Sequence, residues 1–147
     1  NEDLPDIIVY DSLTLRLGGS NVLIWHFGPS HTDGDLVVYF EEKNIIHLGD
    51  IVLAPGVLPY TTSPQGLVAT LENILHRIDD QTKVILGHGN VATQQDLQLL
   101  LSIVKETILF VTKNDNLNTY PKEWEKWNSA FIDVPTWLKI LSKPVQK

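Results

Sequence analysis

The chain lacks cysteine and methionine, and it carries little positive charge. Without cysteine it forms no disulfide, no thiolate zinc site and no cysteine nucleophile. Eleven Lys and Arg residues stand against 18 Asp and Glu residues, which gives a net charge of −7. Such a balance cannot neutralise a row of phosphates, so we expect no nucleic-acid partner and no nuclease activity. No apolar run approaches the ~18 residues of a membrane-spanning helix, so we expect no membrane insertion.

What remains is typical of a folded domain. The chain has 147 residues, of which 43% are apolar and 20% charged. This length predicts a single domain with enough buried surface for a core. The chain begins at Asn1 and contains no Met, so we expect it to be trimmed or excised from a longer protein. A trimmed chain shows no targeting signal, and the compartment stays open.

The first half of the chain has the pattern of β-strands. Short runs rich in β-branched and aromatic residues predict strands at residues 6–10, 13–17, 22–27, 35–40 and 44–48. Glu41 to Lys43 is predicted to be a polar turn between the last two. The last three runs are apolar on both faces, which favours a sheet covered on both sides.

The second half has the pattern of helices. Ser63 is a predicted N-cap for a helix ending near Ile78, and Thr93 with Asp96 predicts a capping box that opens a helix ending near Asn114. A short buried strand is predicted at residues 83–86. Two shorter helices are predicted at 121–131 and 135–141. We therefore expect an α/β fold.

Three polar side chains follow predicted strands and stand in glycine-rich contexts. His31 lies in the loop Gly28 to Gly34, Asp50 follows Gly49, and His88 lies between two glycines. If the strand ends converge at one edge of a sheet, two imidazoles and a carboxylate form a plausible zinc-binding set. Taken singly, each has a simpler interpretation as a turn or capping residue.

The stretches that carry these residues, taken together and in order, resemble the C-terminal half of the metallo-β-lactamase fold superfamily. They are GPSHTDGDLVVYF (28–40), NIIHLGDIV (44–52) and KVILGHGNV (83–91). The resemblance covers about residues 5 to 110. It implies one mixed sheet flanked by helices, half of an αββα sandwich, with residues 115–147 as a helical extension of a single partial domain (1–147).

The resemblance also implies a role for each of these side chains. His31 would bind a first zinc ion, His88 a second, and Asp50 would bridge both and orient the nucleophile. The parent protein would be a zinc-dependent hydrolase in which a bridging water attacks an ester, thioester, lactone or lactam. Asp50 stands where some true lactamases have a cysteine.

The family's main motif, His-x-His-x-Asp-His, is missing. The five histidines are His26, His31, His47, His76 and His88, and no two are two residues apart. A catalytic zinc normally takes three protein ligands, so we expect this chain alone to bind zinc weakly or not at all and to be inactive. The alternative is a non-catalytic interaction or scaffold module of the same fold.

The missing half has a consequence for partners. The inner face of the sheet, drawn from residues 22–27 and 36–40, would be uncovered, and monomers rarely expose large apolar patches. We therefore expect the chain to pair with the missing N-terminal half or to form a homodimer through this face. A small-molecule substrate is the remaining expected partner.

The other polar and aromatic candidates favour structural roles. We expect His26 to serve the core or to contact a ligand residue and His76 to be exposed. For His47 we expect packing, with a contact to a ligand residue near Asp50 as the weaker alternative. Asp35 is equally suited to orienting a ligand or capping its loop. The helical spacing of Trp124, Trp127 and Phe131, with Trp137 in the next helix, favours core packing over a substrate pocket.

Overall fold

A computed structural model describes residues 5–143. Five strands form one mixed sheet in the order β1-β2-β3-β4-β5. The strands are β1 (Ser12–Leu17), β2 (Ser20–Trp25), β3 (Val37–Phe40), β4 (Ile45–His47) and β5 (Lys83–Ile85). Neighbours are antiparallel except β4 and β5, which are parallel and are joined through a helix. The expected α/β fold with one mixed sheet is confirmed.

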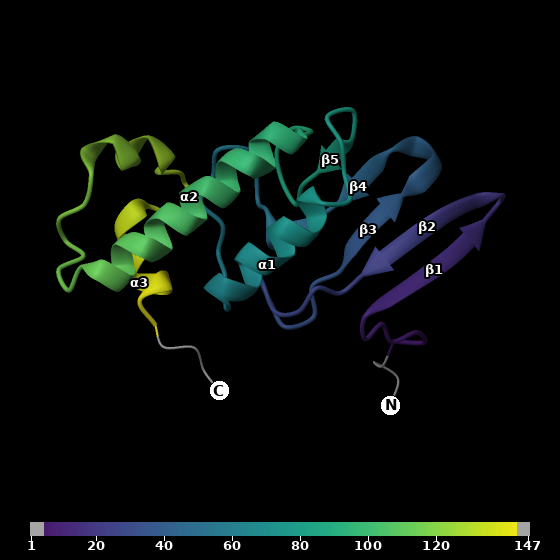
Figure 1. The fold of residues 1–147 in the computed structure, drawn as a ribbon, viewed down its shortest axis with the longest axis horizontal. Coiled ribbons are helices and arrows are strands. Elements are labelled where there is room, and N and C mark those ends of the chain that lie inside the picture. The colour runs from purple at the N-terminus through teal and green to yellow at the C-terminus, as the bar shows by residue number, and fades with distance from the viewer. Residues whose placement is uncertain (1–4, 144–147) are drawn as a thin grey trace.

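Three α-helices and three short 3₁₀ segments complete the described chain. The helices are α1 (Pro64–Leu75), α2 (Gln94–Lys113) and α3 (Val134–Leu141), and the 3₁₀ segments are η1 (Glu41–Lys43), η2 (Gly49–Ile51) and η3 (Lys122–Trp127). In Figure 1 the strands lie toward one end of the molecule and α3 toward the other, with α2 running between them. No helix in residues 5–143 is long and apolar enough to cross a membrane.

The helix N-termini form as their sequences predict. The Ser63 hydroxyl accepts a hydrogen bond from the Gly66 amide and caps α1. Thr93 and Asp96 satisfy each other's backbone amides in a capping box at the start of α2. Each cap supplies partners for amides that the first helical turn leaves unpaired. The N-terminal boundaries of α1 and α2 are therefore fixed by local chemistry.

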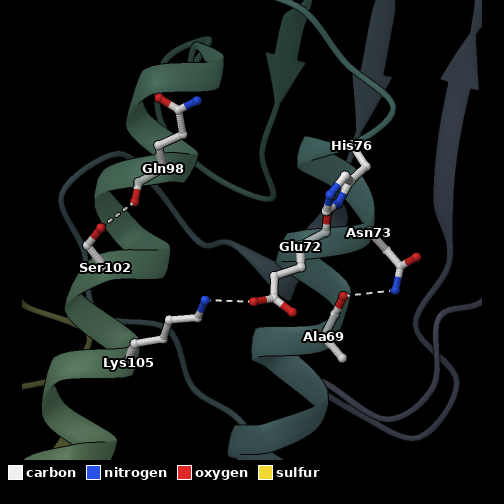
Figure 2. Close-up of polar contacts among 7 residues, drawn as sticks. All are labelled: Ala69, Glu72, Asn73, His76, Gln98, Ser102 and Lys105. Carbon is white, nitrogen blue, oxygen red and sulfur yellow. Dashed lines mark hydrogen bonds and ion pairs between the residues drawn. The ribbon is translucent and has the colours of Figure 1, made fainter.

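Polar contacts tie α1 to α2 on the outside of the molecule. Lys105 Nζ and Glu72 Oε1 lie 2.6 Å apart and form an ion pair between the helices, as Figure 2 shows. The ring of His76 bonds the Glu72 carbonyl on the same exposed surface. His76 is exposed, as expected. An exposed pair of this kind contributes little to stability, so the packing beneath it holds the two helices together.

The core lies between the helices and one face of the sheet. Val37, Ile46 and Val84 of the sheet pack in one cluster with Leu71 of α1 and Leu97 of α2, and each of the five is at most 1% exposed. Trp137 of α3 is fully buried, and its indole nitrogen donates to Thr107 Oγ1 of α2 at 3.0 Å. This bond docks α3 against α2.

The opposite face of the sheet is also apolar. Strand register puts Leu17, Ser20, His47 and Lys83 on it, together with eight further side chains that are all apolar: Leu13, Leu15, Val22, Ile24, Val38, Phe40, Ile45 and Ile85. None of them belongs to the core cluster of the described residues. On β1 the core-side positions, Thr14 among them, are polar while Leu13 and Leu15 stand on the other face. We call these eight residues the open sheet face. Their exposure is uneven: Val22 is 7% exposed and Phe40 is 40% exposed, and the other six are intermediate.

Two predicted elements are wrong. Residues 6–10 are not a strand: Ile7, Ile8 and Tyr10 are 59%, 64% and 78% exposed, and β1 pairs only with β2. Strand propensity depends on a pairing partner, and no described strand offers one here. Residues 121–131 form only the 3₁₀ segment η3, because the chain turns extended at Asn128.

Candidate functional site

The sheet topology brings the loops that carry the three predicted site residues to one edge. Asp50 lies in η2, directly after β4, and His88 follows β5. Because β4 and β5 are parallel neighbours, their carboxyl ends meet at the same edge. Two antiparallel pairings relate β2 to β4, so the loop after β2, which holds His31, reaches that edge as well.

Asp50 and His88 are brought together there. Nε2 of His88 and Oδ1 of Asp50 lie 3.5 Å apart, and both side chains are about half exposed, at 52% and 46%. The backbone amide of His88 donates to the Leu53 carbonyl at 2.8 Å, which ties the loop after β5 to the segment after η2. Two ligand-type side chains from distant parts of the sequence thus face each other.

Glycines make this approach possible. The carboxylate of Asp50 lies directly against the Cα of Gly87, where a Cβ atom would come within 1.8 Å of Oδ1. Any other residue at 87 forces Asp50 to move. Gly49 (φ +53°) and Gly89 (φ +80°) have left-handed backbone conformations, which glycine adopts without steric cost.

His31 stays apart from this pair. Its Nδ1 lies 3.0 Å from the Tyr60 carbonyl, and its ring meets the Tyr60 ring edge-on with centroids 5.6 Å apart. Within residues 5–143 no group of three or more His, Cys, Asp or Glu side chains is placed to hold a metal ion. A catalytic zinc normally takes three protein ligands, so the described residues make an incomplete set for that metal.

The neighbouring polar residues support the loops. Asp35 accepts hydrogen bonds from the backbone amide and hydroxyl of Thr32, so it caps its own loop. His26 is half-buried and lies just past the end of β2, with Nδ1 2.9 Å from the Asp35 carbonyl. His47 does not pack as expected: its ring is exposed, and Nδ1 accepts from the Gly49 amide at 3.0 Å. This bond steadies the turn that carries Asp50.

The aromatic side chains divide between core and site. Trp124, Trp127 and Trp137 are buried, at 3%, 9% and 0% exposure, as their spacing predicts. Phe131 is 60% exposed, and its ring lies 5.6 Å from that of His88. The helical periodicity that placed Phe131 in the core fails because the helix ends before it. Tyr60 and Phe131 therefore flank the site, and no motif in the sequence marks either one.

Solved structures of similar fold identify the architecture. A metallo-β-lactamase from Pontibacter korlensis matches with a TM-score of 0.58 and 22% identity, over 69% of this chain and 49% of that one. The B3 metallo-β-lactamase BLEG-1 matches with a TM-score of 0.54 and 20% identity, over 67% and 48%. No family model matches the sequence.

A longer match extends further along the chain. A double mutant of the sec-alkyl sulfatase PisA1 matches with a TM-score of 0.68 and 14% identity, over 94% of this chain and 26% of that one. The chain thus spans about half the length of the metallo-β-lactamases and about a quarter of the sulfatase. The chain has a partial metallo-β-lactamase fold, as its sequence motifs indicated.

Proposed function

We propose that this chain contributes one half of the active site of a zinc-dependent hydrolase. The observation that carries the proposal is the close approach of Asp50 and His88, whose side chains lie 3.5 Å apart. The Asp50 carboxylate occupies the space that a Cβ atom at Gly87 would fill. An imidazole and a carboxylate are both ligand types that zinc accepts.

The roles follow from the family resemblance. His88 and His31 would each hold one zinc ion, and Asp50 would contact both and orient the nucleophile. Bound zinc would supply Lewis acidity and hydroxide near neutral pH. Tyr60 would orient the His31 ring through the bond to its carbonyl, an arrangement that fixes which ring nitrogen is free.

The proposed substrates are carbonyl compounds: an ester, thioester, lactone or lactam. A sulfate ester is a second candidate, favoured by the match to the alkyl sulfatase. That match covers 94% of the chain, whereas the lactamase matches cover about two thirds. The isolated chain would be inactive, because the described residues lack a third ligand beside Asp50 and His88.

The test is a zinc titration followed by the nitrogen resonances of the histidine rings. Between weak zinc binding and none, the meeting of Asp50 and His88 favours weak binding by the isolated chain. Zinc raised to millimolar concentration is therefore expected to shift the His88 ring signals, and Asp50→Ala is expected to abolish that shift. His76→Ala is the matched control, because His76 is exposed on the helical side and bonds only the Glu72 carbonyl. Unchanged His88 signals at millimolar zinc, or equal shifts in the Asp50→Ala variant, contradict the proposal and favour a non-catalytic module.

We further propose that the open sheet face is covered by a second polypeptide layer, either the other half of the domain or a second copy of the chain. Sedimentation should then show concentration-dependent association, and Val38→Glu on this face should abolish it. Leu109→Glu is the control, because Leu109 is 52% exposed on α2. A monomer at all concentrations that also binds no apolar dye, or equal effects of both variants, contradicts this.

A further inference from the structure

A cavity adjoins the candidate site. It has a volume of about 340 Å³ and lies between α3 and the segments that flank His31 and His88. This is within the range of small-molecule pockets, which span roughly 300–1,000 Å³. Its surface is mostly apolar, so it suits a hydrocarbon or aromatic group.

One wall of the cavity is shared with the site. Tyr60 lines the cavity and contacts the His31 ring, and Phe131 lines it and contacts the His88 ring. Leu53 also lines it, and the Leu53 carbonyl accepts the backbone amide of His88. A molecule in the cavity therefore contacts the residues that touch His31 and His88, two of the three predicted zinc ligands.

The facing wall is basic. Lys139 and Ile140 of α3 line the cavity, together with Lys143, which lies two residues past the end of the helix. No acidic residue lines the cavity, although the chain as a whole carries a charge of −7. In the part of the chain that the structure describes, neither lysine takes part in an ion pair.

We propose that this cavity binds an anionic amphipathic molecule, with its apolar body against Tyr60 and Phe131 and its anionic group at Lys139 and Lys143. The lysine stems extend the apolar surface, and their ammonium groups present the charge at the rim. The inference rests on the proposed function in one respect: it makes this molecule the substrate, with its hydrolysable bond next to His31 and His88.

The test compares three probes with the same chain length on the metal-free 147-residue protein. Octanoate, octan-1-ol and octyltrimethylammonium are titrated while amide signals are followed by NMR. Octanoate is expected to shift the signals of Tyr60, Phe131 and Ile140 and to bind at least about fivefold more tightly than the other two, the scale that two partly exposed charges supply.

Two variants locate the binding. Lys139→Gln combined with Lys143→Gln should weaken octanoate about fivefold and leave octanol unchanged, and Phe131→Ala should weaken both probes. Lys43→Gln, which removes an exposed lysine of η1, is the matched control. All these side chains are exposed, so the variants should keep the amide spectrum of the parent.

Equal affinity for octanoate and octanol, an unaltered double-lysine variant, or shifts confined to the open sheet face would each overturn the proposal. Because the titration contains no zinc, its outcome is separate from that of the zinc experiment. Octanoate binding without any zinc effect on His88 would contradict the proposed hydrolase function and support the proposed binding cavity. A zinc effect on His88 without octanoate binding would contradict only the binding cavity.

Discussion

The bond between Thr107 and Trp137 gives the sharpest prediction about stability, because both residues are completely buried. Thr107→Val keeps the shape of the side chain and removes the acceptor of the indole N–H, now 3.0 Å away. A buried donor left unpaired costs about 1–3 kcal/mol. In a chain of this length we expect a fall in Tm of roughly 4–8 °C for about 2 kcal/mol, measured by thermal unfolding and checked in urea.

A second buried threonine supplies the control. Thr70 of α1 is 1% exposed, and its hydroxyl has no hydrogen-bond partner among residues 5–143. Thr70→Val therefore removes an unsatisfied polar group and is expected to leave Tm unchanged or raise it by roughly 2–4 °C, for a gain of about 1 kcal/mol. In a Trp137→Phe background, which has no indole N–H, the cost of Thr107→Val should largely disappear. Equal losses in the two valine variants, or a cost that persists in the Phe background, would refute the reasoning.

Two further predictions concern the site and acid stability. Gly87→Ala should displace the Asp50 carboxylate and abolish the zinc effect at the site. Its Cβ atom also comes within 3.0 Å of the Gly49 carbonyl oxygen, so the backbone there must give way and Tm should fall as well. A retained zinc effect would show that Asp50 is not a ligand. Hydrogen bonds from Asn44 and Thr82 lower the pKa of Asp79 below its usual 3.8. Their contribution is therefore complete above about pH 3.8 and is lost as the pH falls through the lowered pKa of Asp79, so Asp79→Asn should lower Tm at pH 7 and its effect should shrink steadily as the pH falls below 3.8. A Tm difference that does not vary with pH would contradict this.

Local chemistry made part of the fold predictable. The caps at Ser63 and Thr93 are set by residues within three positions, so their helices begin where the sequence indicates. Residues 6–10 have the same strand propensity as residues 13–17, yet only the latter find a partner, in β2. Pairing is a tertiary property, and propensity alone does not reveal it.

The candidate site was predictable to the extent that it depends on sheet topology. Asp50 and His88 follow two strands that turn out to be parallel neighbours, so their meeting follows from position alone. His31 reaches the same edge on a longer loop, where its Nδ1 atom is hydrogen-bonded to the Tyr60 carbonyl. Tyr60 and Phe131 lie beside the site because irregular segments of the chain place them there. Helix and strand periodicity does not predict the path of such segments.

Under the proposed function, a partner would have two tasks: to cover the open sheet face and to complete the set of zinc ligands. The face needs an apolar layer, whereas Asp50 and His88 need at least one further ligand at the edge of that layer. A partner that performs only the first task would suppress self-association and leave zinc affinity low. A partner that covers the face and also supplies a ligand would suppress self-association and raise zinc affinity together. In that complex Gly87→Ala would reduce zinc affinity without restoring self-association. Measuring sedimentation and zinc affinity on the same complex therefore separates a scaffold, which needs only the covered face, from a hydrolase, which needs both.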